Sequence, residues 1–146
     1  MKTLLALDMN RIFNDTEAAV KARAERIMRE AREEMADPDL RERRTQERAQ
    51  AVEQEAQRIV DAIPDLIAAR IANGEQQQLL LTVSYGYYWG YNRGPARLID
   101  EAQTEHNIAV AKLVIEKCSG IDKLHVTRQE YQQPGRPGGF FVIINW

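Results

Sequence analysis

The sequence has few of the residues on which several classes of protein depend. A single cysteine, Cys118, excludes an intramolecular disulfide and favours a reducing compartment. One cysteine and two histidines do not provide a zinc-finger spacing, and we expect no metal and no cofactor. Lysine and arginine total 20 against 22 acidic residues. Because nucleic-acid binding sums many phosphate contacts, this balance argues against a nucleic-acid partner.

Long hydrophobic runs are also absent. The N-terminal apolar stretch is short and ends at Asp8, so it lacks the long core and small-residue cleavage site of a signal peptide. No stretch approaches the roughly 20 apolar residues that a membrane helix needs. We therefore expect no membrane partner and a cytoplasmic location.

Glycine and aromatic residues are missing from most of the first half of the chain. All 8 glycines follow residue 73, and Phe13 is the one aromatic residue before residue 61. Alanine, glutamate, arginine and glutamine dominate there, and all four favour helices. We predict a charged helical region over 1–73 and a β-α-β-β unit over 74–146, forming one compact domain.

Two long helices are expected in the first half, over about 3–35 and 39–72. The first is either continuous with a weak joint or two segments, 3–13 and 16–35, with a cap at Asn14 or Asp15. Pro38 separates the two helices, and Asn73-Gly74 ends the second. Pro64 predicts a kink or a new helix start within the second helix.

The second helix carries the most regular apolar pattern in the chain. Ala49, Ala56 and Ile63 are seven residues apart, and Val52, Ile59 and Leu66 lie between them. This seam is typical of a coiled coil. It predicts either a hairpin of 16–35 on 39–63 within one chain or an intermolecular coiled coil that makes a homo-oligomer.

The second half predicts strands over 77–85, 124–132 and 140–146, with a helix from Pro95 to about residue 117 and a loop over 134–139. The last strand is apolar on both faces, which is typical of the centre of a sheet. We therefore predict an α+β fold whose antiparallel sheet has the order 1-3-2. One face of the sheet would be covered by a helical stripe made of Leu98, Ala102, Ala109, Val110, Leu113 and Val114.

An unusual aromatic segment joins the first of these strands to the helix. Five of the ten aromatic residues lie within 85–91, and a protein core has no need of so many neighbouring phenols. Tyr, Trp and Arg dominate binding hot spots, so we predict a loop that binds a protein partner. The alternative is that the rings fold back over the sheet. The predicted binding residues are Tyr85, Tyr87, Tyr88, Trp89, Tyr91, Asn92, Arg93 and Arg97, with Arg136 from the loop over 134–139.

A small anionic ligand of nucleotide type is the alternative partner for this loop. The segment enters a helix at Gly94-Pro95, and backbone donors at a helix start favour anions. Arg93 and Arg97 would assist. The residues match neither a P-loop nor a dinucleotide fingerprint.

Candidate catalytic residues are few. His106 lies in the middle of a predicted helix, where a half-buried packing role is the more typical one. His125 lies on a strand, and nothing in the spacing brings the two histidines together. Cys118 is expected to be a buried, inert thiol. We predict no catalytic residues and a non-enzymatic adaptor or inhibitor, a type common among phage-encoded proteins, although no family motif is present.

Overall fold

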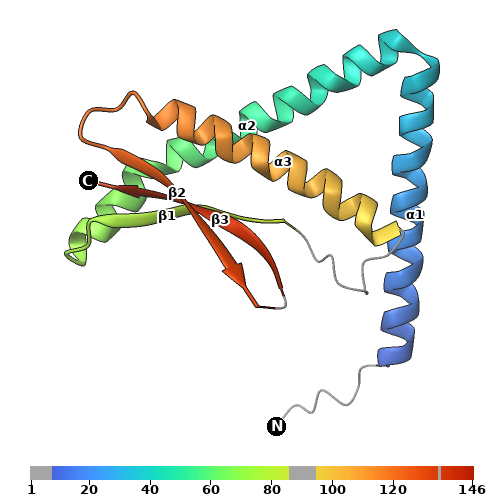
Figure 1. The fold of residues 1–146 in the computed structure, drawn as a ribbon, viewed down its shortest axis with the longest axis horizontal. Helices are drawn as coiled ribbons and strands as arrows, with labels where there is room; N and C mark the ends of the chain where they lie inside the picture. Colours follow the sequence, from blue (N-terminus) through green and yellow to red (C-terminus); the bar gives the residue numbers. More distant parts are fainter. Residues whose placement is uncertain (1–7, 86–94, 135) are drawn as a thin grey trace.

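The structure is a computed structural model that describes residues 8–85, 95–134 and 136–146. The elements follow the expected order, with two long helices before a β-α-β-β unit (Figure 1). They are α1 (Met9–Ala36), α2 (Pro38–Ala72), β1 (Gln77–Ser84), α3 (Pro95–Cys118), β2 (His125–Gln133) and β3 (Arg136–Asn145). In this part of the chain no helix has the length and hydrophobicity needed to span a bilayer.

The three strands form one antiparallel sheet in the order β1-β3-β2, which confirms the predicted fold class. Val142 of β3 lies between Leu81 of β1 and Arg128 of β2. The register of β1 shifts between Leu79 and Leu81, where a bulge interrupts the pairing. The most apolar strand is thus the central one, as a run that is apolar on both faces indicates.

The β2–β3 hairpin is tighter than predicted. Residues 136–139 were expected in a loop, but Arg136 already begins β3 and lies opposite Gln133. Glycine and proline suggest a loop by composition, whereas here two of the glycines lie within a strand. Gly138 and Gly139 are needed there because β1 and β2 approach the β3 backbone closely.

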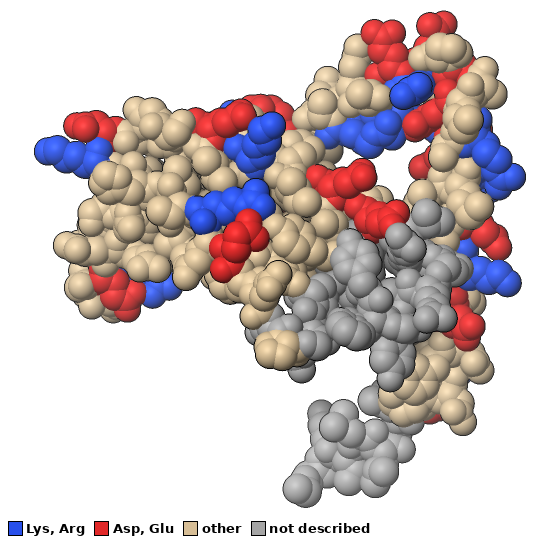
Figure 2. All heavy atoms as spheres, in the orientation of Figure 1, with Lys and Arg blue, Asp and Glu red and all other residues tan. Residues whose placement is uncertain are grey.

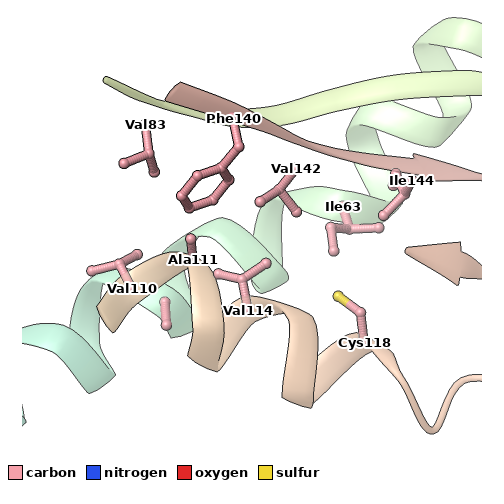
Figure 3. Packing of buried hydrophobic residues seen from close by; sticks show 10 residues of the cluster. Ile63, Val83, Val110, Ala111, Val114, Cys118, Phe140, Val142 and Ile144 are labelled. Carbon is pink, nitrogen blue, oxygen red and sulfur yellow. The ribbon is translucent and has the colours of Figure 1, made fainter. Parts of the chain in front are cut away.

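One hydrophobic core joins the sheet to α2 and α3. In Figure 3 the strand side chains point toward the helices, and the α3 side chains point back toward the sheet. The buried residues are Val83, Phe140, Val142 and Ile144 from the sheet, Val110, Ala111, Val114 and Cys118 from α3, and Ala56 and Ile63 from α2. Both helices therefore cover the same face of the sheet.

The buried stripe of α3 lies nearer the C-terminal end of the helix than predicted. Val110 and Val114 are buried as expected, but Ala102 is exposed, and Leu98 lies outside the described side chains. Helix α3 also contacts α1, and Figure 1 shows the start of α3 lying next to α1. A helical pattern shows which face is apolar, but it does not show which neighbour covers each turn.

Helix α1 starts later than predicted and has no joint. Asp8 is extended, and its side chain accepts a hydrogen bond from the Arg11 N–H at 3.2 Å. This is a strong N-terminal cap, so α1 begins at Met9, and the predicted helical residues before Asp8 lie outside the described residues. It continues through Asn14 and Asp15 to Ala36. Similarly, α2 continues through Pro64, which does not start a new helix.

The predicted hairpin of 16–35 packed on 39–63 does not form along its length. Figure 1 shows α1 and α2 diverging from the corner at Asp37, with α3 lying across the opening. The polar contacts between α1 and α2 lie close to the corner, where Arg44 pairs with Glu33 and Arg48 with Glu34, both at 2.9 Å. Ala56 of the α2 seam is fully buried in the core, so it is available neither to α1 nor to a second chain, and Ile63 also packs against this core.

Candidate functional site

The pairing of the strands places several predicted site segments at one end of the sheet, which we call the loop end. Ser84 at the end of β1 and Tyr131 near the end of β2 both lie opposite Gly139. The Tyr85 N–H donates to the Gly138 carbonyl at 3.0 Å. The exit of β1 and the β2–β3 hairpin are therefore neighbours, as the predicted strand order requires.

Helix α3 is also attached to this end. The Thr104 hydroxyl donates to the Ser84 carbonyl at 3.5 Å, which links the first half of α3 to the end of β1. The segment between Tyr85 and Pro95 thus leaves from one fixed point and returns to a helix held beside it. This segment is short, and both of its ends are positioned by the fold.

Tyr85 is the predicted site residue whose side chain the structure describes. It is half-buried, and its ring packs against Phe140 with 6.1 Å between centroids. Its hydroxyl donates to Glu130 and accepts from Arg128, both at 3.0 Å. The phenol is therefore held at three points.

The other predicted site residues cannot be placed in the same way. Tyr87, Tyr88, Trp89, Tyr91, Asn92 and Arg93 lie outside the described residues. Arg97 is in the first turn of α3 and Arg136 is the first residue of β3, but their side chains lie outside the description. The assignment of these eight residues to a binding site remains a prediction.

Arg128 is the centre of a polar cluster that the sequence analysis did not single out. Its guanidinium lies 3.8 Å from the centroid of the Phe140 ring, and its Nε donates to Glu130 at 2.8 Å. The paired Glu130 carboxylate raises the pKa of Arg128. We call Tyr85, Arg128, Glu130 and Phe140 the Arg128 cluster.

The signal for this cluster was present in the strand pattern. Arg128 alternates with Leu124 and Val126, which both pack against the core. A charged residue at an inward-facing strand position needs a partner, because an unpaired charge next to apolar groups is costly. Here the ring of Phe140 and the carboxylate of Glu130 provide that partner.

The backbone at the loop end is closely packed around Gly139. A Cβ at this position would lie 2.8 Å from Cζ of Tyr131 and would also clash with the Val83 carbonyl oxygen. The Tyr131 ring in turn stacks on Phe141, with 4.7 Å between centroids. The absence of a side chain at Gly139 is what lets the three strands come together here.

The two histidines have different surroundings. His106 of α3 lies 2.5 Å from the Glu55 carboxylate of α2, so it joins the two helices. It lines a hollow of about 270 Å³ whose wall is formed mainly by alanine and valine. His125 is exposed on β2, away from this pair. The described residues contain no group of three metal ligands.

Cys118 is buried, as predicted. Burial raises the pKa of its thiol, which lowers the fraction of reactive thiolate. Its side chain belongs to the core between α3 and the sheet (Figure 3). This position indicates a structural residue.

The described part of the chain thus offers a positioned loop end, a His106–Glu55 pair between α3 and α2, and a buried cysteine. Basic and acidic side chains are interspersed on the face shown in Figure 2. No protein-family model, no curated protein and no solved structure matches this chain, so its function has to be inferred from its own residues.

Proposed function

We propose that this protein is a non-enzymatic adaptor or inhibitor that binds a partner protein through the aromatic loop over 85–97 and self-associates through its helices. The observation that carries the proposal is the convergence of segments at the loop end. The exit of β1, the β2–β3 hairpin and the first half of α3 are tied to one another there by backbone pairing and by the Thr104 contact.

The Arg128 cluster supports this proposal by fixing the first residue of the loop. Tyr85 is held by Arg128, Glu130 and Phe140. A loop with fixed ends loses less conformational entropy when it binds, so more of the contact energy appears as affinity. Aromatic side chains add large contact areas for few rotatable bonds.

Charge at this end favours a protein over a polyanion. Arg128 is paired with Glu130, whose carboxylate offsets its charge. A groove that follows a nucleic-acid backbone needs several such cations. Aromatic residues and arginine are enriched at protein–protein interfaces.

A small anionic ligand of nucleotide type is the second candidate. It is favoured by the start of α3 at Pro95, directly after the loop, with Arg93 and Arg97 nearby in the sequence. The N-terminus of a helix stabilises negative charge. Thermal unfolding in the presence of a panel of nucleotides separates the candidates, because a ligand bound only to the folded state raises the melting temperature.

The direct test of the proposal is truncation of the loop aromatics. We expect Trp89→Ala and Tyr88→Ala each to weaken binding to the partner by about 2 kcal/mol, because buried aromatic anchors contribute most of the affinity at hot spots. The partner is first captured with the intact chain, and its affinity for each variant is then measured by calorimetry. Met35→Ala, which truncates an exposed apolar side chain of α1, is the matched control.

The melting temperatures of the same variants complete the test. The proposal requires that Trp89→Ala unfolds at the same temperature as the intact chain. If both substitutions instead lower the melting temperature as core truncations do, the rings belong to the folded interior and the proposed site is wrong.

A further inference from the structure

Strand β2 has a free edge. It is an outer strand of the sheet, with β3 on one side and, in the described part of the chain, no strand on the other (Figure 1). Its pairing with β3 is regular from His125 to Tyr131. A regular outer strand presents unpaired N–H and C=O groups with which another strand can pair. We call this side of β2 the β2 edge.

The backbone groups that lie on the β2 edge follow from the hydrogen bonds of β3. The Gly138 carbonyl accepts from the Tyr85 N–H at 3.0 Å. The Trp146 N–H donates to the Gln76 carbonyl at 3.2 Å. The even-numbered residues of β3 therefore bond toward β1, and its odd-numbered residues bond toward β2, because the direction alternates along a strand. These odd residues lie opposite odd residues of β2, such as Thr127, so the even residues of β2 direct their N–H and C=O groups to the β2 edge.

The outer edge of β1 is less suited to pairing. A bulge between Leu79 and Leu81 interrupts this strand, and the Ser84 carbonyl accepts from the Thr104 hydroxyl at 3.5 Å. Bulges and covered edges are means by which proteins prevent strands of different molecules from pairing. Strand β2 contains neither lysine nor proline, which are two further means of this kind. The β2 edge is thus the one open to another strand.

We infer that the β2 edge pairs antiparallel with the β2 edge of a second copy of this chain, in a register centred on Gln129. A two-fold dimer uses the same surface of both copies. Because Gln129 is the middle residue of β2 (His125–Gln133), this register pairs the strand along its whole length. It also makes Arg128 and Glu130, whose backbone groups both point to the edge, a hydrogen-bonded pair. This contact is separate from the self-association through helices proposed above.

Side-chain charge favours this register over its neighbours. Arg128 of each copy would lie opposite Glu130 of the other copy, on the same face of the sheet. A register centred on Arg128 would place two arginines opposite each other, and one centred on Glu130 would place two glutamates opposite each other. Like charges directly opposite destabilise a sheet. The two charges therefore oppose the nearest alternative registers and stabilise the centred one.

Arg128 and Glu130 can gain these partners without releasing Tyr85. Within one chain the Arg128 Nε donates to Glu130 at 2.8 Å, and its Nη2 donates to the Tyr85 hydroxyl at 3.0 Å. The side chains of Arg128 and Glu130 nevertheless remain 45% and 57% exposed. In the dimer each carboxylate would have one arginine beside it on its own strand and a second arginine opposite it. The four charges would thus alternate in sign.

The other face of β2 is also compatible with this pairing. Gln129 would lie opposite Gln129 of the second copy, and Thr127 opposite Tyr131. These residues are uncharged, so no repulsion arises on this face. A strand from another protein would need a base and an acid two residues apart to match Arg128 and Glu130, and β2 itself has that spacing. The sequence of β2 therefore favours a second copy over an unrelated strand.

The test is disulfide trapping in the full chain. Gln129 is exposed and would lie about 4.5 Å from its counterpart between Cα atoms, which is within disulfide range. We expect Gln129→Cys to form a covalent dimer in a glutathione redox buffer, detected by non-reducing electrophoresis. Thr127→Cys is the matched control, because it is exposed on the same face but would lie roughly 13 Å from its counterpart. It should remain monomeric, and the buried Cys118 is present in both variants.

Charge variants of Gln129 provide a second readout, by sedimentation velocity. We expect the intact chain to sediment above its 16.8 kDa monomer as concentration rises. Gln129→Lys and Gln129→Glu should each lose this dimer, because like charges would then face each other across the two-fold axis. An equal mixture of the two variants should regain it, because lysine would face glutamate. Circular dichroism checks that each variant is folded.

Four results would overturn the inference. Equal trapping of Gln129→Cys and Thr127→Cys would indicate random collision, and stronger trapping of Thr127→Cys would indicate another register. A mixture of the charge variants that stays monomeric would show that the two β2 edges do not pair. A dimer that persists in Gln129→Lys would leave self-association to the helices, as in the proposed function, whereas partner binding by the loop is decided separately by Trp89→Ala.

Discussion

At the scale of single residues, Arg128 and Gly139 determine the geometry of the loop end. Arg128 holds Tyr85 by a hydrogen bond to its hydroxyl and contacts the Phe140 ring. Gly139 allows Tyr131 and the Val83 carbonyl to approach the central strand. Neither set of contacts can be predicted from the amino-acid composition, because both depend on which strands become neighbours.

Gly139→Ala tests the close packing at this end. The added methyl group would meet the Val83 carbonyl oxygen and the Tyr131 ring, and backbone at this position cannot move aside without disturbing the strand pairing. We expect a loss of about 2–3 kcal/mol in the free energy of unfolding, measured in urea.

Gly120→Ala is the matched control for this substitution. A Cβ at Gly120 meets no atom within 4 Å, so the change should stay within about 0.5 kcal/mol. Equal stability of the two variants would show that the strands are not as close at Gly139 as described.

At the scale of secondary-structure elements, the three helices differ in the contacts that hold them in place. Helices α2 and α3 contribute buried residues to the core, whereas α1 has Ala24 as its buried residue. Near the corner, α1 is also held by ion pairs of Glu33 and Glu34 with Arg44 and Arg48. Buried apolar residues therefore contribute less to the placement of α1 than to that of the other two helices.

The pH dependence of stability tests the corner. Hydrogen bonding to Arg48 lowers the pKa of Glu34 in the folded chain. A carboxyl whose pKa is lower in the folded state stabilises that state above its unfolded pKa of about 4.3, and this contribution is lost as the pH falls through the folded value. Glu34→Gln should thus lower stability at neutral pH, by at most about 1 kcal/mol, and have no effect in acid.

Urea unfolding of the intact chain and of Glu34→Gln at several pH values measures this difference. Glu25→Gln, on the exposed side of α1, controls for the loss of one negative charge. A difference for Glu34→Gln that persists below the folded pKa would contradict an electrostatic origin.

Sequence patterns predicted which helices and strands form better than they predicted how these elements pack together. The apolar β3, the turn at Asp37-Pro38 and the glycine and proline boundaries gave the strand order and the second helix correctly. The seam of α2 was recognised, but an apolar stripe does not identify its partner, and that partner is the core and not α1. The start of α1 at Met9 was not predicted, although aspartate is a favoured N-cap residue.

Part of the candidate site could be predicted from the strand order. Because antiparallel pairing follows from the strand order, the neighbouring positions of the β1 exit and the β2–β3 hairpin could be expected. The hydrogen bonds of Tyr85 with Arg128 and with Glu130 join residues more than 40 positions apart in sequence, so no local pattern indicates them.

The whole molecule has two ends with different surfaces. The loop end has Tyr85 and the rest of the Arg128 cluster, whereas the C-terminal half of α2 borders an apolar groove lined by Ile67, Ile71 and Trp146. With a formal charge of −2, the chain as a whole has no strong electrostatic preference for a partner. Recognition would therefore depend on local contacts at these two ends.

The accessibility of the Trp89 indole tests the central claim, that the loop aromatics face solvent and are free to bind. The chain has two tryptophans, so Trp146→Phe leaves Trp89 as the single emitter, and Trp89→Phe reports Trp146 for comparison. In acrylamide quenching we expect Trp89 of the folded chain to be quenched nearly as efficiently as in the urea-unfolded chain, with emission at long wavelength. Short-wavelength emission and strong protection in the folded state would contradict the account, because they would place the indole in the interior.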